Sequence, residues 1–172
     1  QTKLVTVTVT LPLGPDKRVL AGPPPDVTTV SVSSTKYVTV TDSVTDTTTI
    51  LPKFLLDVTP KTRTGLGAPD SPSSIVRYVH KLTNNGNVTR TVNVQIRTVR
   101  GWQTEVNTDT ITLEPGDDKA KFLTVSVTIP SGTLQGTTET TYVDLSVPDE
   151  PSQNQTITDT TVARKGLNRG SR

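Results

Sequence analysis

Apolar residues alternate with threonine near the start of the chain, in the stretch TKLVTVTVTLPLG at positions 2–14. Successive side chains of an extended strand point to opposite sides, so this alternation predicts a β-strand over residues 4–13 with one apolar side. The apolar side is formed by Val5, Val7, Val9, Leu11 and Leu13. Such a strand is not stable alone in water, so we expect its apolar side to be covered by another segment or another molecule.

Threonine and valine dominate the rest of the chain as well. Threonine makes up about one residue in five, and β-branched side chains favour strands over helices. No stretch repeats apolar residues at helical spacing for more than about two turns. The 172 residues are therefore expected to be all-β, as one domain with an extension or as two small domains.

Residues 1–50 are predicted to form an amino-terminal extension. Besides the first strand, strand-like runs occur at 27–32 and 36–41, and TDSVTDTTTILP that follows is typical of a short strand or a linker. The stretch PLGPDKRVLAGPPPD is rich in proline, which stiffens the chain and removes ladder hydrogen bonds. We expect it to act as a semi-rigid connector behind the first strand.

Residues 51–163 are predicted to form a domain of two packed antiparallel sheets. Turn signals such as NNGN, EPGDD and PSGTLQG divide this part into short strands at regular spacing, which favours a sandwich. The predicted strands cover residues 54–59, 75–83, 89–98, 102–106, 109–113, 119–129, 137–147 and 155–163. The side chains expected to face the core are Val76, Tyr78, His80, Leu82, Val92, Val94, Ile96, Ile111, Leu113, Leu123, Val125, Val127, Ile129, Val143, Leu145 and Val147.

Three stretches of this domain resemble a known family. They are VRYVHKLTNNGNVTRTVNVQI, GWQTEV and ITLEPGDDKAKFLTVSVTIPSGTLQGTTETTYVDLSV. Residues 54–163 resemble the Ig-like conserved-repeat domains of bacterial and archaeal surface proteins, and are similar to the sandwich module appended to some α-galactosidases. The resemblance implies an Ig-like antiparallel β-sandwich, here with an amino-terminal β-strand extension, and a non-catalytic, extracellular role. It implies no functional residue and does not cover residues 1–50.

Catalytic chemistry is not expected. His80 is the only histidine, and its position in a strand predicts a packed, hydrogen-bonded side chain rather than a catalytic base. The acid pairs Asp117–Asp118 and Asp149–Glu150 fall in predicted turns, where acids are common; a weak calcium site there is the alternative. We expect no catalytic residue, no cofactor and no metal site.

Three residues are candidates for contact with sugars. Trp102 is expected to cap a sheet edge or the core, with a sugar-stacking platform as the alternative. Asn87 and Asn154 each begin an Asn-X-Thr sequence beside a turn, where an N-linked glycan can be attached. A chain this rich in threonine also produces such sequences by chance.

Charge and composition bear on partners and location. The net charge is +2 and aromatic residues are 3% of the chain, so we expect no nucleic-acid binding. The basic residues of segment 164–172 are interpreted as a solvated tail. No apolar run is long enough to span a membrane. The chain begins with Gln and contains no cysteine or methionine, from which we expect a secreted, extracellular or cell-surface protein whose signal peptide has been removed.

Three partners are open to the first strand: its own sandwich, residues 27–41, or a groove of the next subunit. The third option is donor-strand complementation, which makes a homopolymer. The preferred hypothesis is a secreted subunit of a filament or pilus-like appendage for adhesion, biofilm or envelope structure. The alternatives are an accessory module that binds surface glycans or protein in an envelope complex, and an accessory protein of a surface layer or virus particle.

Overall fold

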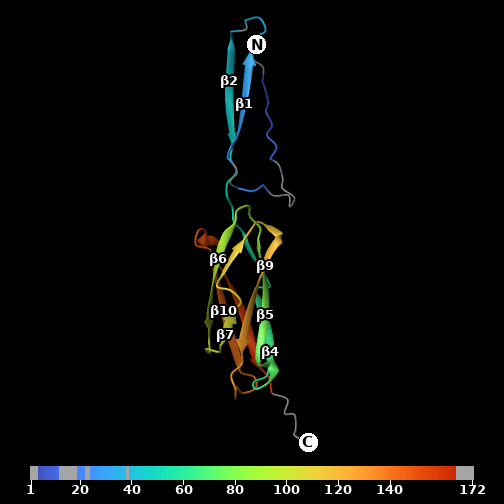
Figure 1. The fold of residues 1–172 in the computed structure, drawn as a ribbon, viewed down its shortest axis with the longest axis vertical. Coiled ribbons are helices and arrows are strands. Elements are labelled where there is room, and N and C mark those ends of the chain that lie inside the picture. The colour runs from blue at the N-terminus through green and yellow to red at the C-terminus, as the bar shows by residue number, and fades with distance from the viewer. Residues whose placement is uncertain (1–3, 12–18, 22–23, 38, 166–172) are drawn as a thin grey trace. The chain divides into compact units, whose positions relative to one another are not determined.

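The computed structural model describes residues 4–11, 19–21, 24–37 and 39–165 (Figure 1). The chain divides into two compact units, Gln1–Lys53 and Phe54–Arg172. The only helices among the described residues are two short 3-10 turns, η1 (Pro72–Ser74) and η2 (Pro151–Gln153). Neither turn, nor any other described segment, is a helix that could cross a bilayer.

The first unit contains a two-stranded antiparallel sheet of β1 (Asp26–Ser33) and β2 (Thr41–Thr48) (Figure 1). Val30 pairs with Val44, and Val32 pairs with Asp42. Because side chains alternate along each strand, these four residues share one side of the hairpin. Most side chains of both strands are exposed, so the hairpin has no buried core of its own.

Two strand predictions for this unit were wrong. Residues 4–11 are not in a strand, because no described strand pairs with their backbone; residues 12 and 13 of that predicted strand lie outside the described part. The described residues Lys36, Tyr37, Thr39 and Val40 belong to the loop of the hairpin rather than to a strand, and residue 38 lies outside the described part. In that loop the Ser34 hydroxyl accepts hydrogen bonds from the backbone N–H of Lys36 and Tyr37, at 3.3 and 3.0 Å. Local side-chain bonding of this kind replaces strand pairing.

The second unit is a sandwich of two sheets, which confirms the predicted all-β, Ig-like fold. The five-stranded sheet has the order β4–β11–β10–β6–β8, and the four-stranded sheet has the order β3–β5–β9–β7. The strands are β3 (Leu56–Thr59), β4 (Thr62–Gly67), β5 (Ile75–Asn84), β6 (Arg90–Thr98), β7 (Thr104–Val106), β8 (Thr110–Leu113), β9 (Gly116–Thr128), β10 (Thr138–Ser146) and β11 (Gln155–Ala163). All neighbouring strands pair antiparallel except β4 and β11, which are parallel.

The core lies between the two sheets, and the alternation predicted it well. Of the residues expected to face inward, all are buried except Val76 and Ile96, which are partly buried. Phe54, Trp102 and Ile157 also belong to the core. The buried residues come in the period of two that packed sheets require.

Strand β4 was not predicted. The chain leaves the four-stranded sheet at Thr59, passes through the cis bond to Pro60, and joins the five-stranded sheet at Thr62. The sequence TRTGLG has two glycines and no apolar alternation, so the period of two gives no strand signal here. Gly65 is needed for close packing here, because a Cβ atom at this position would lie 2.6 Å from the Tyr78 hydroxyl.

Candidate functional site

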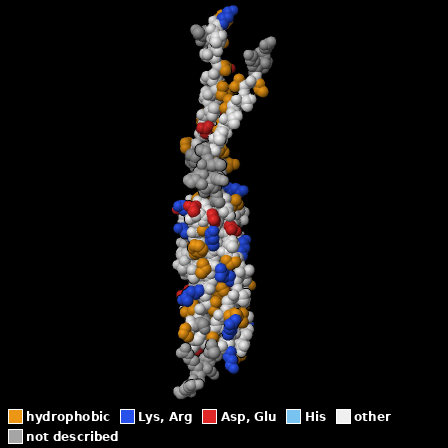
Figure 2. Space-filling view, turned by 90° about the vertical axis from the view of Figure 1, so that its right-hand side faces the viewer, with side chains coloured by type: hydrophobic (Ala, Val, Ile, Leu, Met, Phe, Trp, Pro, Cys, Tyr) orange, Lys and Arg blue, Asp and Glu red, His pale blue; other side chains and the backbone are white. Residues whose placement is uncertain are grey.

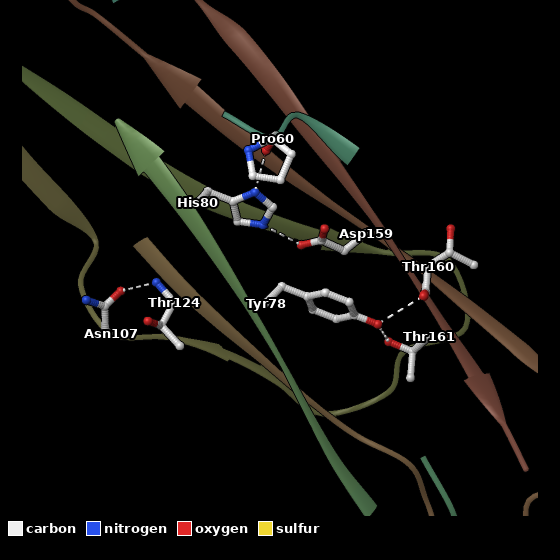
Figure 3. Close-up of polar contacts among 8 residues, drawn as sticks. All are labelled: Pro60, Tyr78, His80, Asn107, Thr124, Asp159, Thr160 and Thr161. Carbon is white, nitrogen blue, oxygen red and sulfur yellow. Dashed lines mark hydrogen bonds and ion pairs between the residues drawn. The ribbon is translucent and has the colours of Figure 1, made fainter. Parts of the chain in front are cut away.

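A buried polar cluster joins the two sheets behind β4. His80 on β5 lies with its Nδ1 2.7 Å from the carbonyl oxygen of Pro60 and its Nε2 3.0 Å from a carboxylate oxygen of Asp159 on β11 (Figure 3). Both side chains are fully buried. The Tyr78 hydroxyl donates to the carbonyl of Thr160 at 2.9 Å and lies 2.7 Å from the Thr161 hydroxyl (Figure 3). The predicted packed, hydrogen-bonded histidine is confirmed.

The partners of His80 favour its charged form. Both ring nitrogens face acceptor oxygens, so only the doubly protonated ring donates to both at once when Asp159 is ionised. Burial by itself lowers the pKa of His80, but the hydrogen bonds to Asp159 and Pro60 and the negative charge of Asp159 outweigh it and raise the pKa above its ordinary value. The cluster therefore links the two sheets through a buried, charged hydrogen bond between His80 and Asp159. The His80 ring is not exposed to a substrate.

The free energy of unfolding is expected to fall as the pH rises above about 6.5, the ordinary pKa of histidine. Because folding raises the pKa of His80, its stabilisation is fully present below the unfolded value and is lost as the pH rises through the folded value. The ring signals of the only histidine identify themselves in an NMR titration, and their midpoint should lie above 6.5. A midpoint at or below about 6.5 contradicts this interpretation. A His80→Gln variant should lose this part of the pH dependence.

A second buried acid anchors the loop between β6 and β7. The carboxylate of Glu139 on β10 is fully buried. It accepts hydrogen bonds from the backbone N–H groups of Val99 at 2.8 Å, Arg100 at 3.0 Å and Trp102 at 3.0 Å. Gly101 has a positive φ of 77°, which brings these N–H groups round one carboxylate. Asp159 and Glu139 were both missed, although each is at an inward-facing position of its strand.

The structure corrects the alternative interpretation of Trp102. Only 7% of this side chain is exposed, and it belongs to the core cluster. A buried ring cannot serve as a sugar-stacking platform, because its face must be open to the sugar. Tyr142 is half-buried, and the guanidinium of Arg97 lies over its ring at 5.0 Å from the centroid.

The candidate glycosylation and calcium residues lie at the surface. Asn87 is half-buried in the turn after β5, and Asn154 is exposed in the turn before β11. The acid pairs are engaged with bases: Asp117 with Lys81 at 2.6 Å, and Asp149 and Glu150 with Arg90 at 3.7 and 3.5 Å. Within the described ranges, no three His, Asp or Glu side chains come together in a way that could hold a metal ion.

Residues Leu4–Leu11, the donor segment, remain partly exposed. The exposed fractions of Val5, Val7, Val9 and Leu11 are 65%, 41%, 37% and 41%; Leu13 lies outside the described residues. Val5 shares a groove of about 210 Å³ with Val30, Val32 and Val44 of the hairpin. Val9 and Leu11 line another groove of about 400 Å³ together with Pro24, Pro25, Asp26, Val27, Thr48 and Ile50. The segment thus touches the hairpin through side chains while its backbone pairs with no described strand.

The sandwich has an incompletely paired edge beside β8. Strand β7 pairs with β9 only from Val125 to Val127. Asn107 extends this pairing: its backbone N–H donates to the Thr124 carbonyl at 3.1 Å, and its side-chain oxygen accepts from the Thr124 N–H at 2.8 Å (Figure 3). On that side of β9, no described strand pairs with residues 116–122.

A groove of about 400 Å³ lies at this edge. We call it the β8–β9 groove; it is lined by Asn107, Thr108, Thr110, Ile111, Thr112, Lys121 and Phe122. Strand β8 is the last strand of its sheet, so its outer edge is also unpaired among the described strands. Phe122 is 60% exposed although it is one of the largest apolar side chains. Two open strand edges and an exposed phenylalanine therefore meet at one place.

On the face shown in Figure 2, basic side chains occur along the length of the sandwich, most of the visible acidic ones lie near its upper end, and hydrophobic ones lie among them. Of the basic tail, Arg164 and Lys165 are described and exposed; the rest lies outside the described residues.

Comparisons with known proteins identify no family for this chain. No protein-family model matches the chain, and no curated protein does. Among solved structures, a PapD-like domain of human CEP192 matches with 12% identity and a TM-score of 0.46, over 64% of this chain and 84% of that one. The secreted serine protease VesC from Vibrio cholerae matches with 15% identity and a TM-score of 0.47, over 63% of this chain and 23% of that one.

A third match is the CsuC–CsuE chaperone–tip adhesion subunit complex from Csu pili of Acinetobacter baumannii. The identity is 11% and the TM-score 0.42, over 65% of this chain and 52% of that one. All three TM-scores are below 0.5, so the assignment to the Ig-like β-sandwich class rests on the strand order and the core described above.

Proposed function

We propose that the protein is a secreted structural subunit that assembles by amino-terminal strand exchange into an extracellular filament or pilus-like appendage. Such a filament would serve adhesion, biofilm or envelope structure. One observation carries the proposal. The donor segment has the alternation of a strand, yet it pairs with no described strand and leaves the four side chains of its apolar side, Val5, Val7, Val9 and Leu11, between 37% and 65% exposed.

Strand pairing with a second copy would resolve this conflict. An extended segment that joins a sheet edge gains main-chain hydrogen bonds, and its alternate side chains fill pockets on one side. Full burial of a valine or leucine side chain contributes roughly 1.5–3 kcal/mol, so four such side chains provide a substantial driving force. The two-stranded hairpin of the first unit gives the segment no core in which to bury them.

The same exchange repeated between identical subunits produces a linear assembly. The surface that gives the strand differs from the surface that receives it, so the contact is heterologous. Heterologous contacts continue without limit unless they close into a ring. Thus a single kind of contact is enough to build a filament.

The alternative of a sugar-binding module has lost its main support. That hypothesis relied on Trp102 or Tyr142; the ring of Trp102 is buried, and Arg97 lies over the half-buried ring of Tyr142.

Matched charge substitutions in the donor segment test the proposal. The Val7→Asp/Val9→Asp variant places two charges on the apolar side, and the Thr6→Asp/Thr8→Asp variant places the same charges on the other side. Electron microscopy and sedimentation of the full chain should show filaments for the unaltered protein and the threonine variant, and only monomers for the valine variant, since a charge cannot be buried unpaired. A monodisperse unaltered protein, or filaments from the valine variant, contradicts the proposal.

A further inference from the structure

We infer that the β8–β9 groove is the acceptor site, and that its occupant is the donor segment of a second copy of this chain. The inference rests on the proposed function and deepens it, because it states where on the neighbouring sandwich the segment binds. Its basis is the incomplete strand pairing beside β9, the size of the groove, and the side chains that line it.

The vacant edge has room for most of the donor segment. Strand β9 runs from Gly116 to Thr128, β7 occupies its edge from Val125 to Val127, and the Asn107 side chain donates to the Phe122 carbonyl at 3.3 Å. Residues 116–121 are left, a span of about 20 Å at roughly 3.3 Å per residue. The segment Leu4–Leu11 spans about 26 Å on the same measure. A bound segment would lie in line with β7 and pair with the part of β9 that β7 does not reach, at the edge of the four-stranded sheet.

The side chains at the groove suit a strand that is apolar on one side only. Ile111 faces the core on the inner side of the groove, Phe122 lies on the outer face of β9, and Thr108, Thr110 and Thr112 provide hydroxyls along the rim. A donor segment in line with β7 can place its valines on the inner side, towards Ile111, and its threonines on the outer side or towards water. Phe122 is 60% exposed, and the outer side of this occupant would lie beside its ring.

Charged residues on β9 favour this occupant over other strands. Asp117, Asp118, Lys119 and Lys121 lie along the vacant part of the strand. Charges of this kind on an open edge prevent indiscriminate pairing between sheets. Residues 4–11 contain no charged side chain, so the segment meets no like-charge repulsion of either sign. Asn107 occupies the backbone groups at Thr124 and the carbonyl of Phe122 and therefore limits how far the segment extends along β9.

Disulfide mapping can locate the acceptor, because the natural chain has no cysteine. Full-length donor proteins carry Val7→Cys or Thr8→Cys, which sample both sides of the segment. Full-length acceptor proteins carry Thr110→Cys on β8 or, as the matched control, Thr62→Cys on β4, the strand at the opposite edge of the same sheet. Each donor is refolded together with each acceptor, allowed to assemble and then oxidised. A disulfide forms only when the two Cα atoms come within about 7 Å.

We expect at least one donor cysteine to give tenfold or more donor–acceptor dimer with Thr110→Cys than with Thr62→Cys. If filaments form but neither donor links to Thr110→Cys, or both link better to Thr62→Cys, the acceptor assignment is overturned while the filament proposal stands. If the unaltered chain forms no filaments, both are overturned. The two failures are therefore distinguishable.

An aspartate substitution gives a second, independent readout. Phe122→Asp should raise the critical concentration for assembly at least tenfold, and Leu134→Asp, which changes a side chain that is 79% exposed in a loop away from the groove lining, should change it less than twofold. Both variants should unfold at nearly the same temperature as the unaltered monomer. Equal critical concentrations for the two variants would overturn the assignment.

Discussion

Replacing Glu139 with alanine is expected to lower the free energy of unfolding by about 3–5 kcal/mol, because several buried backbone N–H groups lose their acceptor at about 1–3 kcal/mol each. The carboxylate is fully buried and accepts hydrogen bonds from the backbone N–H groups of Arg100 and Trp102. The N–H group of Val99 donates both to this carboxylate and to the Thr140 carbonyl. Buried donors left without an acceptor lose their full hydration energy without compensation. The substitution therefore removes the anchor of the loop at Arg100 and Trp102, while the bond of Val99 to the Thr140 carbonyl remains.

Urea denaturation of the full chain measures this effect. The fluorescence of Trp102, the only tryptophan, reports on the same loop. Glu139→Gln should also be destabilised, because the NH2 group that replaces one carboxylate oxygen is a donor and would face backbone N–H groups, which are also donors. Glu105→Ala, which removes an exposed carboxylate on β7, should stay within about 0.5 kcal/mol of the unaltered protein. A loss below about 1 kcal/mol for Glu139→Ala would show that water satisfies the loop equally well.

Replacing His80 with leucine is expected to cost about 3–5 kcal/mol at neutral pH, because it leaves the buried charge of Asp159 unpaired. Both side chains are fully buried, and Asp159 Oδ1 has no hydrogen-bond donor among the described residues. The His80→Leu/Asp159→Leu variant should recover most of the loss, since two apolar side chains of similar size replace a buried ion pair at little cost.

A double-mutant cycle with Asp159→Leu completes the measurement. Asp159→Leu alone should cost less than His80→Leu, because the histidine ring can lose its proton and become neutral. The interaction between the two sites should exceed about 1 kcal/mol, as for residues in one network. If the double variant loses as much stability as the two single variants added together, His80 and Asp159 do not act as a pair.

The alternation of side chains predicted the sandwich strands and the core because burial on one face of a sheet enforces a period of two. It placed Leu82, Leu113 and Val143 in the core, where each is fully buried. The same period places Asp159 and Glu139 inward, but polarity argued against burial. Only the structure shows that Pro60, His80 and the N–H groups of the loop after β6 compensate for that burial.

The alternation of apolar and polar side chains does not predict which strands pair with each other. TRTGLG at β4 has no alternation, yet its backbone joins β11 as a parallel neighbour. Conversely, residues 4–11 have the clearest alternation in the chain and no described strand partner. A side-chain pattern states which side of a segment is apolar, and the availability of a neighbouring edge decides whether a strand forms. That difference is why the β8–β9 groove was not predicted.

The parallel pairing of β4 with β11 bears on how a subunit would carry tension. The six residue pairs run from Thr62 with Thr158 to Gly67 with Ala163. A pull towards the amino terminus enters β4 at its first residue, and a pull towards the carboxyl terminus leaves β11 at its last. Such a force shears the two strands along their length. The hydrogen bonds between them must then break together rather than one pair after another. The sandwich therefore resists stretching along the direction in which its own chain enters and leaves it.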